Sequence, residues 1–206
     1  MIDKDNSVNI KGAKRGYHHG DLRLALVTAG LKLLNDRAAQ DLSLREVARH
    51  VGVSATAVYR HFPDKQALLY AMCEQGSVAM AAMQGAAIDA AGGSVKGFEA
   101  AGRTYVQFAL ANPALYRLMM TTKPSVDHYD LDASAMGSAM RLLKDCVSDV
   151  LPQSASADEH RAMALHAWAL VHGISMLMLD ELVPPDPDMI NALVTMAVKQ
   201  TMPQKD

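Results

Sequence analysis

The chain has 206 residues, of which 50% are hydrophobic and 5% are aromatic, and its formal net charge is −2. This length allows one small and one larger domain, and the richness in alanine, leucine and methionine favours helices over strands. No apolar run approaches the roughly 20 residues of a membrane-spanning helix, so we expect a cytoplasmic protein without membrane contact. The two cysteines, Cys73 and Cys146, lack the spacing of a disulfide framework or zinc cluster, and the sequence leaves a redox role open.

The charges are unevenly distributed along the chain. Residues 1–65 contain 11 Lys and Arg against 7 Asp and Glu, whereas residues 66–206 contain 9 against 15. A basic first part joined to an acidic remainder is typical of a polyanion-binding domain attached to one that does not bind nucleic acid. A chance imbalance is the alternative.

The predicted elements begin after a basic arm, residues 1–16, which we expect to be flexible without a partner. Its cations Lys11, Lys14 and Arg15 either reach the DNA backbone or minor groove or remain solvated. From about Asp21 to near Asn35, apolar residues recur at helical spacing and predict a first helix. They are Leu22, Leu26, Ala29 and Leu33.

Two short helices follow, each with recognisable end signals. Ser43 opens an S-x-x-E capping box, and this second helix ends at Gly52, where a left-handed cap needs a residue without a Cβ. Ser54 caps a third helix, which Pro63 terminates. Asp64 then caps a fourth, longer helix.

Helical spacing continues to the end of the chain. We predict helices near 65–90, 95–111, 113–121, 131–150, 157–181 and 187–202, separated by segments that contain Gly, Asn or Pro. The expected fold is therefore all-α, with the arm at 1–16, a helix-turn-helix domain at 17–64 and a helical ligand-sensing and dimerisation bundle at 65–206.

The second and third helices have the spacing of a helix-turn-helix, whose second helix inserts its N-terminal residues into the major groove. With Ala57, Val58 and His61 expected in the core, the exposed residues of the third helix are Ala55, Thr56, Tyr59 and Arg60. Small Ala55 and Thr56 permit close approach to base edges, and Arg60 or Arg45 can donate a bidentate pair to guanine. Donors suited to phosphate are Ser43, Tyr59, His61 and Lys65. A helical hairpin with solvated charges is the alternative.

Three segments of this region carry a more specific pattern: GYHHGDLR at 16–23, LSLREVA at 42–48 and GVSATAVYRHFPDK at 52–65. Together they resemble the DNA-binding domain of the tetracycline-repressor (TetR) family. The resemblance implies a three-helix DNA-binding head, a helical regulatory domain, two-fold dimers and, usually, repression relieved by a ligand. By position it also implies DNA contacts for Arg45, Ala55, Thr56, Tyr59, Arg60, His61 and Lys65.

Two later segments, NPALYRLMM at 112–120 and WALVHG at 168–173, resemble one type of TetR-family regulatory domain, with a W-x-x-x-H-G signature. The candidate ligand-binding residues are Tyr116, Met119, Met120, Trp168, His172 and Met176. Ordinary core packing is the alternative, with His172 as a buried histidine bonded across the core. The expected effector is small and largely apolar, because this domain has no arginine cluster for a phosphate and no metal-ligand triad. We therefore expect no metal and no cofactor.

Apolar stripes mark the last two helices, at Leu165 and Leu177 and at Leu193, Met196 and Ala197. In the family, the corresponding helices pair with their copies in a four-helix dimer interface. We therefore predict a homodimeric repressor that binds a pseudo-palindromic operator in double-stranded DNA and is released by a small-molecule effector. Two hypotheses stay open beside it: a ligand-independent architectural DNA-binding protein, and an activator or dual regulator. An enzyme is not expected, because no catalytic motif is present.

Overall fold

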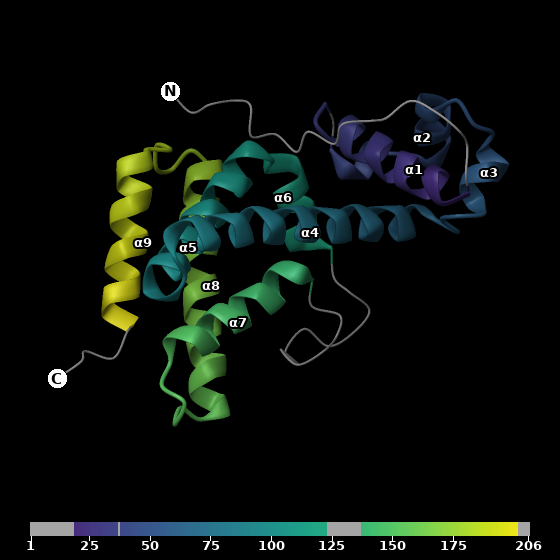
Figure 1. Ribbon diagram of the computed structural model, residues 1–206. Coiled ribbons are helices and arrows are strands. Elements are labelled where there is room, and N and C mark those ends of the chain that lie inside the picture. The colour runs from purple at the N-terminus through teal and green to yellow at the C-terminus, as the bar shows by residue number, and fades with distance from the viewer. Residues whose placement is uncertain (1–18, 37, 123–136, 202–206) are drawn as a thin grey trace. The chain divides into compact units, whose positions relative to one another are not determined.

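The computed structural model describes residues 19–36, 38–122 and 137–201, and every regular element in these ranges is a helix (Figure 1). In chain order they are α1 (His19–Leu34), the short 3-10 helix η2 (Ala39–Asp41), α2 (Leu44–Val51), α3 (Ala55–Tyr59), α4 (Lys65–Ala91), α5 (Ser94–Ala111), α6 (Pro113–Thr121), α7 (Ser138–Val150), α8 (Ala157–Leu179) and α9 (Pro187–Thr201). This confirms the predicted all-α class.

The predicted helix ends agree with the structure to within a few residues where the structure describes them. Helices α4, α5 and α6 differ from the predicted ranges by at most one residue at each end. The helix predicted at 131–150 is observed from Ser138, and residues 131–136 lie outside the described ranges, as does the arm at 1–16. Helix α8 ends at Leu179, two residues before the predicted end.

The chain forms two compact units that share α4. The first unit holds α1, α2, α3, the part of α4 up to Ser77, and α6. The second unit holds α4 from Val78 onward, together with α5, α7, α8 and α9. The domain boundary predicted between residues 64 and 65 falls at the start of α4 and stays a prediction. The first unit continues along this helix to Ser77, almost halfway to its end.

Side chains from α1, α2, α3, α4 and α6 close the core of the first unit. Fully buried examples, one from each of these helices, are Leu26, Val47, Val58, Met72 and Tyr116. Helix α2 packs against both α1 and α3. Helix α1 approaches α4 closely at Gly30, because a Cβ at this position would lie only 2.8 Å from the Sδ atom of Met72. The two short helices α2 and α3 are therefore held in place by tertiary packing rather than by their length.

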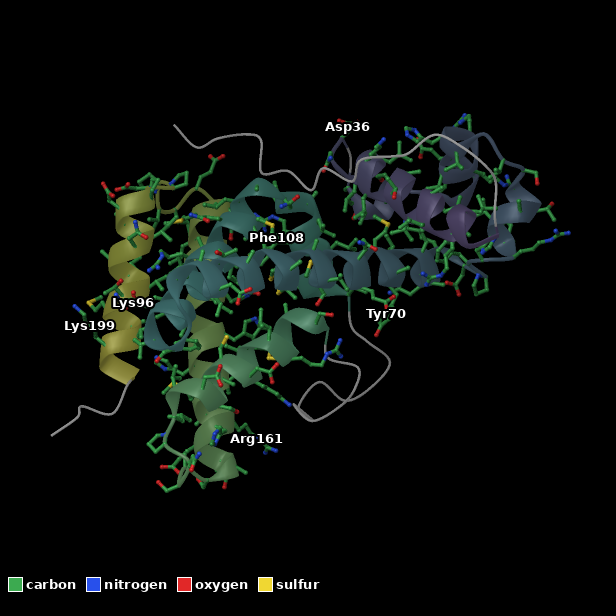
Figure 2. The ribbon with its side chains drawn as sticks, viewed as in Figure 1. Asp36, Tyr70, Lys96, Phe108, Arg161 and Lys199 are labelled. Carbon is green, nitrogen blue, oxygen red and sulfur yellow. The ribbon has the colours of Figure 1, made fainter. Side chains whose placement is uncertain are left out.

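Helix α5 lies at the centre of the second unit, because it packs against α7, α8 and α9. One core cluster contains Phe98, Cys146, Val147, Ala164 and Val198, and a second contains Val106, Ile174, Met178, Ile190 and Val194. Phe108 of α5 is fully buried, whereas Arg161 of α8 and Lys199 of α9 lie on the surface of this unit (Figure 2). Helices α8 and α9 thus bury one side each inside the unit.

Helix α8 corrects one expectation from the sequence. By length and composition it is apolar enough to cross a membrane, although no such segment was expected. The reason is that α8 is apolar on more than its inner face: Leu165 and Leu177 are 52% and 46% exposed. Within the second unit, α8 packs against α5, α7 and α9.

Candidate nucleic-acid interface

The turn between α2 and α3 has the geometry that the sequence predicts. The Oγ atom of Ser43 accepts a hydrogen bond from the backbone N–H of Glu46 at 3.2 Å, which confirms the N-cap of α2. Gly52 ends this helix with φ +82°, and its N–H donates to the carbonyl of Ala48 at 2.9 Å. Apart from its chain neighbours, no described residue has an atom within 4 Å of a Cβ built on Gly52, so the left-handed backbone, and not lack of space, requires glycine here.

Helix α3 and the start of α4 are fixed by two further caps. The Oγ atom of Ser54 accepts from the N–H of Ala57 at 3.2 Å. Asp64 Oδ1 accepts from the N–H of Ala67 at 2.8 Å, which confirms the predicted cap of α4. Between them, Phe62 is only 1% exposed and anchors the end of α3 in the core. These local bonds orient the single face of α3 that remains accessible.

The accessible residues of α3 are those that can donate hydrogen bonds. Val58 is fully buried, which confirms its predicted inward position, while Thr56, Tyr59 and Arg60 are exposed. Ala55, Ala57 and His61 are half-buried, so the inward position expected for Ala57 and His61 is only partly attained. The exposed side of α3 therefore offers a hydroxyl, a phenol and a guanidinium, and among its described residues it carries no carboxylate.

Lys65 has a role within the fold that the sequence did not indicate. Its Nζ atom donates to the backbone carbonyl of Gln40 at 2.6 Å and so links the start of α4 to η2. An ammonium has three N–H donors, so this bond leaves capacity for a phosphate. Ser43 and Arg45, the remaining predicted DNA contacts, are both exposed at the start of α2. The DNA-contact roles of all these residues stay predictions.

Arg23 is a residue whose position only the structure reveals. Its Cζ atom lies 5.2 Å from the centroid of the Phe62 ring, which is within the range of a cation–π interaction. This contact links α1 to the end of α3. Two exposed basic residues in the last turn of α2, Arg49 and His50, were given no role in the sequence analysis. The signal that could have found them is the preference for basic residues at helix C-termini.

The six candidate effector residues divide between the two units. Tyr116, Met119 and Met120 lie on α6 in the first unit, where Tyr116 is fully buried and the two methionines are half-buried. The Sδ atom of Met119 lies 2.8 Å from a Cβ built on Gly76 of α4, so this methionine packs against a glycine. Trp168, His172 and Met176 belong to α8 in the second unit and are all half-buried.

The three α8 candidates lie on one side of the helix, as predicted. The rings of Trp168 and His172 have centroids 6.3 Å apart and planes inclined by 58°. Trp168 Nε1 donates to the hydroxyl of Tyr105 on α5 at 3.2 Å, a partner that the sequence did not indicate. Burial lowers the pKa of His172, which favours a neutral imidazole at pH 7. The α8 side chains thus form a neutral aromatic and polar cluster next to α5.

Neither metal chemistry nor reactive thiols are indicated in the described ranges. Those residues contain no group of three or more His, Cys, Asp or Glu placed to hold a metal ion. Burial raises the pKa of Cys73, and burial together with the charges of Asp149 and Asp145 raises the pKa of Cys146 to about 11. Both cysteines are therefore mainly protonated at neutral pH, which disfavours nucleophilic or redox chemistry.

A capped helix-turn-helix in an all-helical chain, followed by a separate helical unit, defines a DNA-binding transcriptional regulator. The family model described as "Bacterial regulatory proteins, tetR family" matches residues 26–72, and the one described as "Tetracyclin repressor-like, C-terminal domain" matches residues 98–200. The chain belongs to the TetR family. It is a family of transcriptional regulators, which confirms that the chain is not an enzyme.

Solved structures agree with this assignment. A protein with unknown function from Rhodococcus sp. RHA1 is 31% identical, with a TM-score of 0.70 over 91% of this chain and 97% of that chain. A TetR family transcription regulator from Marinobacter aquaeolei VT8 is 18% identical, with a TM-score of 0.62 over 88% of this chain and 95% of that one. A TetR transcriptional regulator from Rhodococcus sp. RHA1 is 15% identical, with a TM-score of 0.60 over 92% and 100%. The last two show the shared fold alone.

Proposed function

We propose that the protein is a homodimeric transcriptional repressor in the cytoplasm, which binds a pseudo-palindromic operator and is released by a small, largely apolar effector. The observation that carries this proposal is the exposed face of α3, where Thr56, Tyr59 and Arg60 project from a helix that three local caps hold in place. Such a face suits the major groove, where threonine contacts thymine methyl groups and arginine pairs with guanine.

The exposed apolar face of α8 and α9 supports a dimer. Leu165 and Leu177 on α8 and Met196 on α9 are each about half exposed, which is unusual for large apolar side chains on neighbouring helices. Gly173 lies between the two leucines on α8, and apart from the local backbone of α8 no atom of the described residues lies within 4 Å of a Cβ built there. A second copy of α8 can therefore approach closely at Gly173 and cover both leucines. Leu193 of α9 is half-buried, and Ala197 is buried inside the unit, so Ala197 is not part of this face.

Dimerisation supplies the geometry that operator recognition needs. Two α3 helices related by a two-fold axis read adjacent major grooves when they are roughly 34–36 Å apart, about one turn of DNA. We propose that the apo dimer keeps the heads at this spacing and that the effector favours a state with another spacing. A coupling of about 1–3 kcal/mol corresponds to roughly 5–150-fold weaker DNA binding. The half-buried Trp168, His172 and Met176 on α8 support an effector contact in the second unit.

The test is selection of bound sequences from random DNA duplexes by the purified full-length protein at about 150 mM salt. Enrichment of a palindrome with half-sites one helical turn apart supports the dimeric operator-binding regulator. Binding that depends on salt but enriches no sequence contradicts it and favours the architectural alternative. Placing the enriched operator before a reporter gene then separates repression from activation, because a repressor lowers expression and an activator raises it.

A further inference from the structure

Gln84 is an unusual residue in the interior of the second unit. It lies on α4 and is only 7% exposed. The surrounding part of this helix, residues 78–88, contains no charged residue and is otherwise built of alanine, glycine, methionine, valine and isoleucine. An amide at such a position must be hydrogen-bonded on both sides to avoid a loss of stability.

Only one side of the Gln84 amide has a partner among the described residues. Its Nε2 atom donates to the backbone carbonyl of Ala101 on α5 at 3.1 Å. Its Oε1 atom is buried and accepts no hydrogen bond from any described residue. Exchanging the two amide atoms does not solve this, because Oε1 would then face the carbonyl oxygen of Ala101, and two acceptors repel each other. The amide orientation is therefore fixed, and within the described ranges no residue donates to the buried Oε1 atom.

Other polar groups lie one helical turn away along α5. Tyr105 follows Ala101 by four residues, so the two share a face of α5. The hydroxyl of Tyr105 accepts from Trp168 Nε1 at 3.2 Å, and the His172 ring lies next to Trp168. On the other side of Ala101, α4 and α5 are in close contact, because a Cβ built on Gly97 would lie 3.0 Å from Ile88 Cγ2. Gln84 and the Tyr105–Trp168 pair are thus connected through one turn of α5 within the second unit.

The interior around these groups is uncharged. Among the described residues of the second unit, no buried side chain carries a charge; the buried polar ones are Gln84, Thr104 and Ser175. Burial also lowers the pKa of His172, as expected for an imidazole that stays neutral. A charged molecule that entered this interior would lose its hydration without meeting an opposite charge. The chemistry therefore suits a neutral ligand.

We propose that Gln84 Oε1 is the acceptor for a hydrogen bond from the effector, and that the effector is an uncharged, largely apolar molecule with one hydroxyl or amide N–H donor. This inference rests on the proposed function, in which the second unit binds an effector. Helix α4 runs without interruption from Lys65 in the first unit to Ala91 in the second. A ligand bonded to Gln84 therefore acts on the helix whose first turn follows the DNA-binding head.

The experiment compares the full-length wild type with Gln84→Met, which keeps the length of the side chain and removes the acceptor. Gln107→Met, an exposed position on α5, is the matched control. The probes form two sets, each with a hydroxyl compound, a methyl ether and a carboxylate on a similar apolar frame. The aromatic set is 1-naphthol, 1-methoxynaphthalene and 1-naphthoate, and the aliphatic set is 1-octanol, heptyl methyl ether and octanoate. Calorimetry gives the Kd of each probe, and thermal unfolding gives the Tm of each apo protein.

In the wild type and in Gln107→Met, we expect at least one alcohol or phenol to bind ten-fold or more tightly than its ether and its carboxylate. In Gln84→Met, the difference between alcohol and ether disappears while the affinity for the ether is kept. The Tm of each apo protein shows whether the variant is folded; its sign is not a criterion, because Gln84→Met removes the unpaired oxygen together with the hydrogen bond from Nε2 to the carbonyl of Ala101.

Three outcomes overturn the inference: no alcohol or phenol binds, the alcohol is not preferred over the ether, or Gln84→Met keeps the preference. Operator binding is measured on the same preparations. If a charged or donor-free compound releases the operator equally from wild type and Gln84→Met, the inference fails while the proposed function stands. If the alcohols bind as expected and operator affinity does not change, the site stands and the release mechanism fails.

Discussion

Substitution by alanine should change the free energy of unfolding in opposite directions at Gly52 and Gly85, although both glycines have free space around them. Beyond the adjacent backbone, the part of the chain that the structure describes has no atom within 4 Å of a Cβ built on Gly52 or on Gly85, so steric overlap plays no part at either position. Gly52 has φ +82° at the end of α2, whereas Gly85 lies within the continuous helix α4. The backbone conformation alone therefore decides the effect of a methyl group.

The magnitudes follow from these conformations. An L-residue in the left-handed region costs about 1–2 kcal/mol, so Gly52→Ala should lower the free energy of unfolding by this amount. Alanine is favoured over glycine inside a helix by about 0.5–1 kcal/mol, so Gly85→Ala should raise it. Gly52→Asn should cost less than Gly52→Ala, because asparagine tolerates the left-handed region. For a chain of this length, 1 kcal/mol corresponds to roughly 2–4 °C in Tm.

Urea unfolding followed by circular dichroism measures all three variants against the wild type. The unfolding of each unit must be followed by its own spectroscopic signal, because Gly52 lies in the first unit and Gly85 in the second. The single tryptophan, Trp168, reports on the second unit by fluorescence. A neutral or stabilising Gly52→Ala, or a Gly85→Ala as damaging as Gly52→Ala, would refute the reasoning, because the sign would then not follow from φ.

Three further predictions concern function and pH. If Arg60 reads a base, Arg60→Ala should weaken binding to the selected operator by about 1–3 kcal/mol and relax specificity at one base pair, as measured by fluorescence anisotropy. Lys96→Ala on α5 in the second unit (Figure 2) is the control and should leave affinity and specificity unchanged. Leu177→Glu on α8 should convert dimers to monomers in analytical ultracentrifugation, while Leu182→Glu in the exposed loop after α8 should not; a dimeric Leu177→Glu contradicts the proposed interface. Because burial lowers the pKa of His172, the unfolded chain takes up a proton near pH 6.5 that the folded chain refuses, so stability should fall as the pH drops below about 6.5. His172→Gln should lose less stability than the wild type between pH 7.5 and 5.5, and equal losses in the two proteins would exclude His172 as the cause.

The sequence by itself determined the local structure of the DNA-binding head. Ser43, Ser54 and Asp64 each bond a backbone N–H three residues ahead, and Gly52 adopts its left-handed conformation at the helix end. These features depend on residues three to four positions apart, so their signals are contained in a short window of sequence. For the same reason, the ends of α4, α5 and α6 were predicted closely.

Only the tertiary structure decided which distant residues meet. Trp168 bonds Tyr105, Lys65 bonds the carbonyl of Gln40, and Gln84 bonds the carbonyl of Ala101. Periodicity shows that a helix has an apolar face, but it does not show which helix covers that face. Helix α8 illustrates the difference: after Arg161 it contains no charged residue, and only packing against α5 and α9 distinguishes its inner face from the exposed one with Leu165 and Leu177. That Gln84 Oε1 accepts no hydrogen bond from any described residue is likewise a property of packing, because a polar atom is cut off from water only once the core has closed around it.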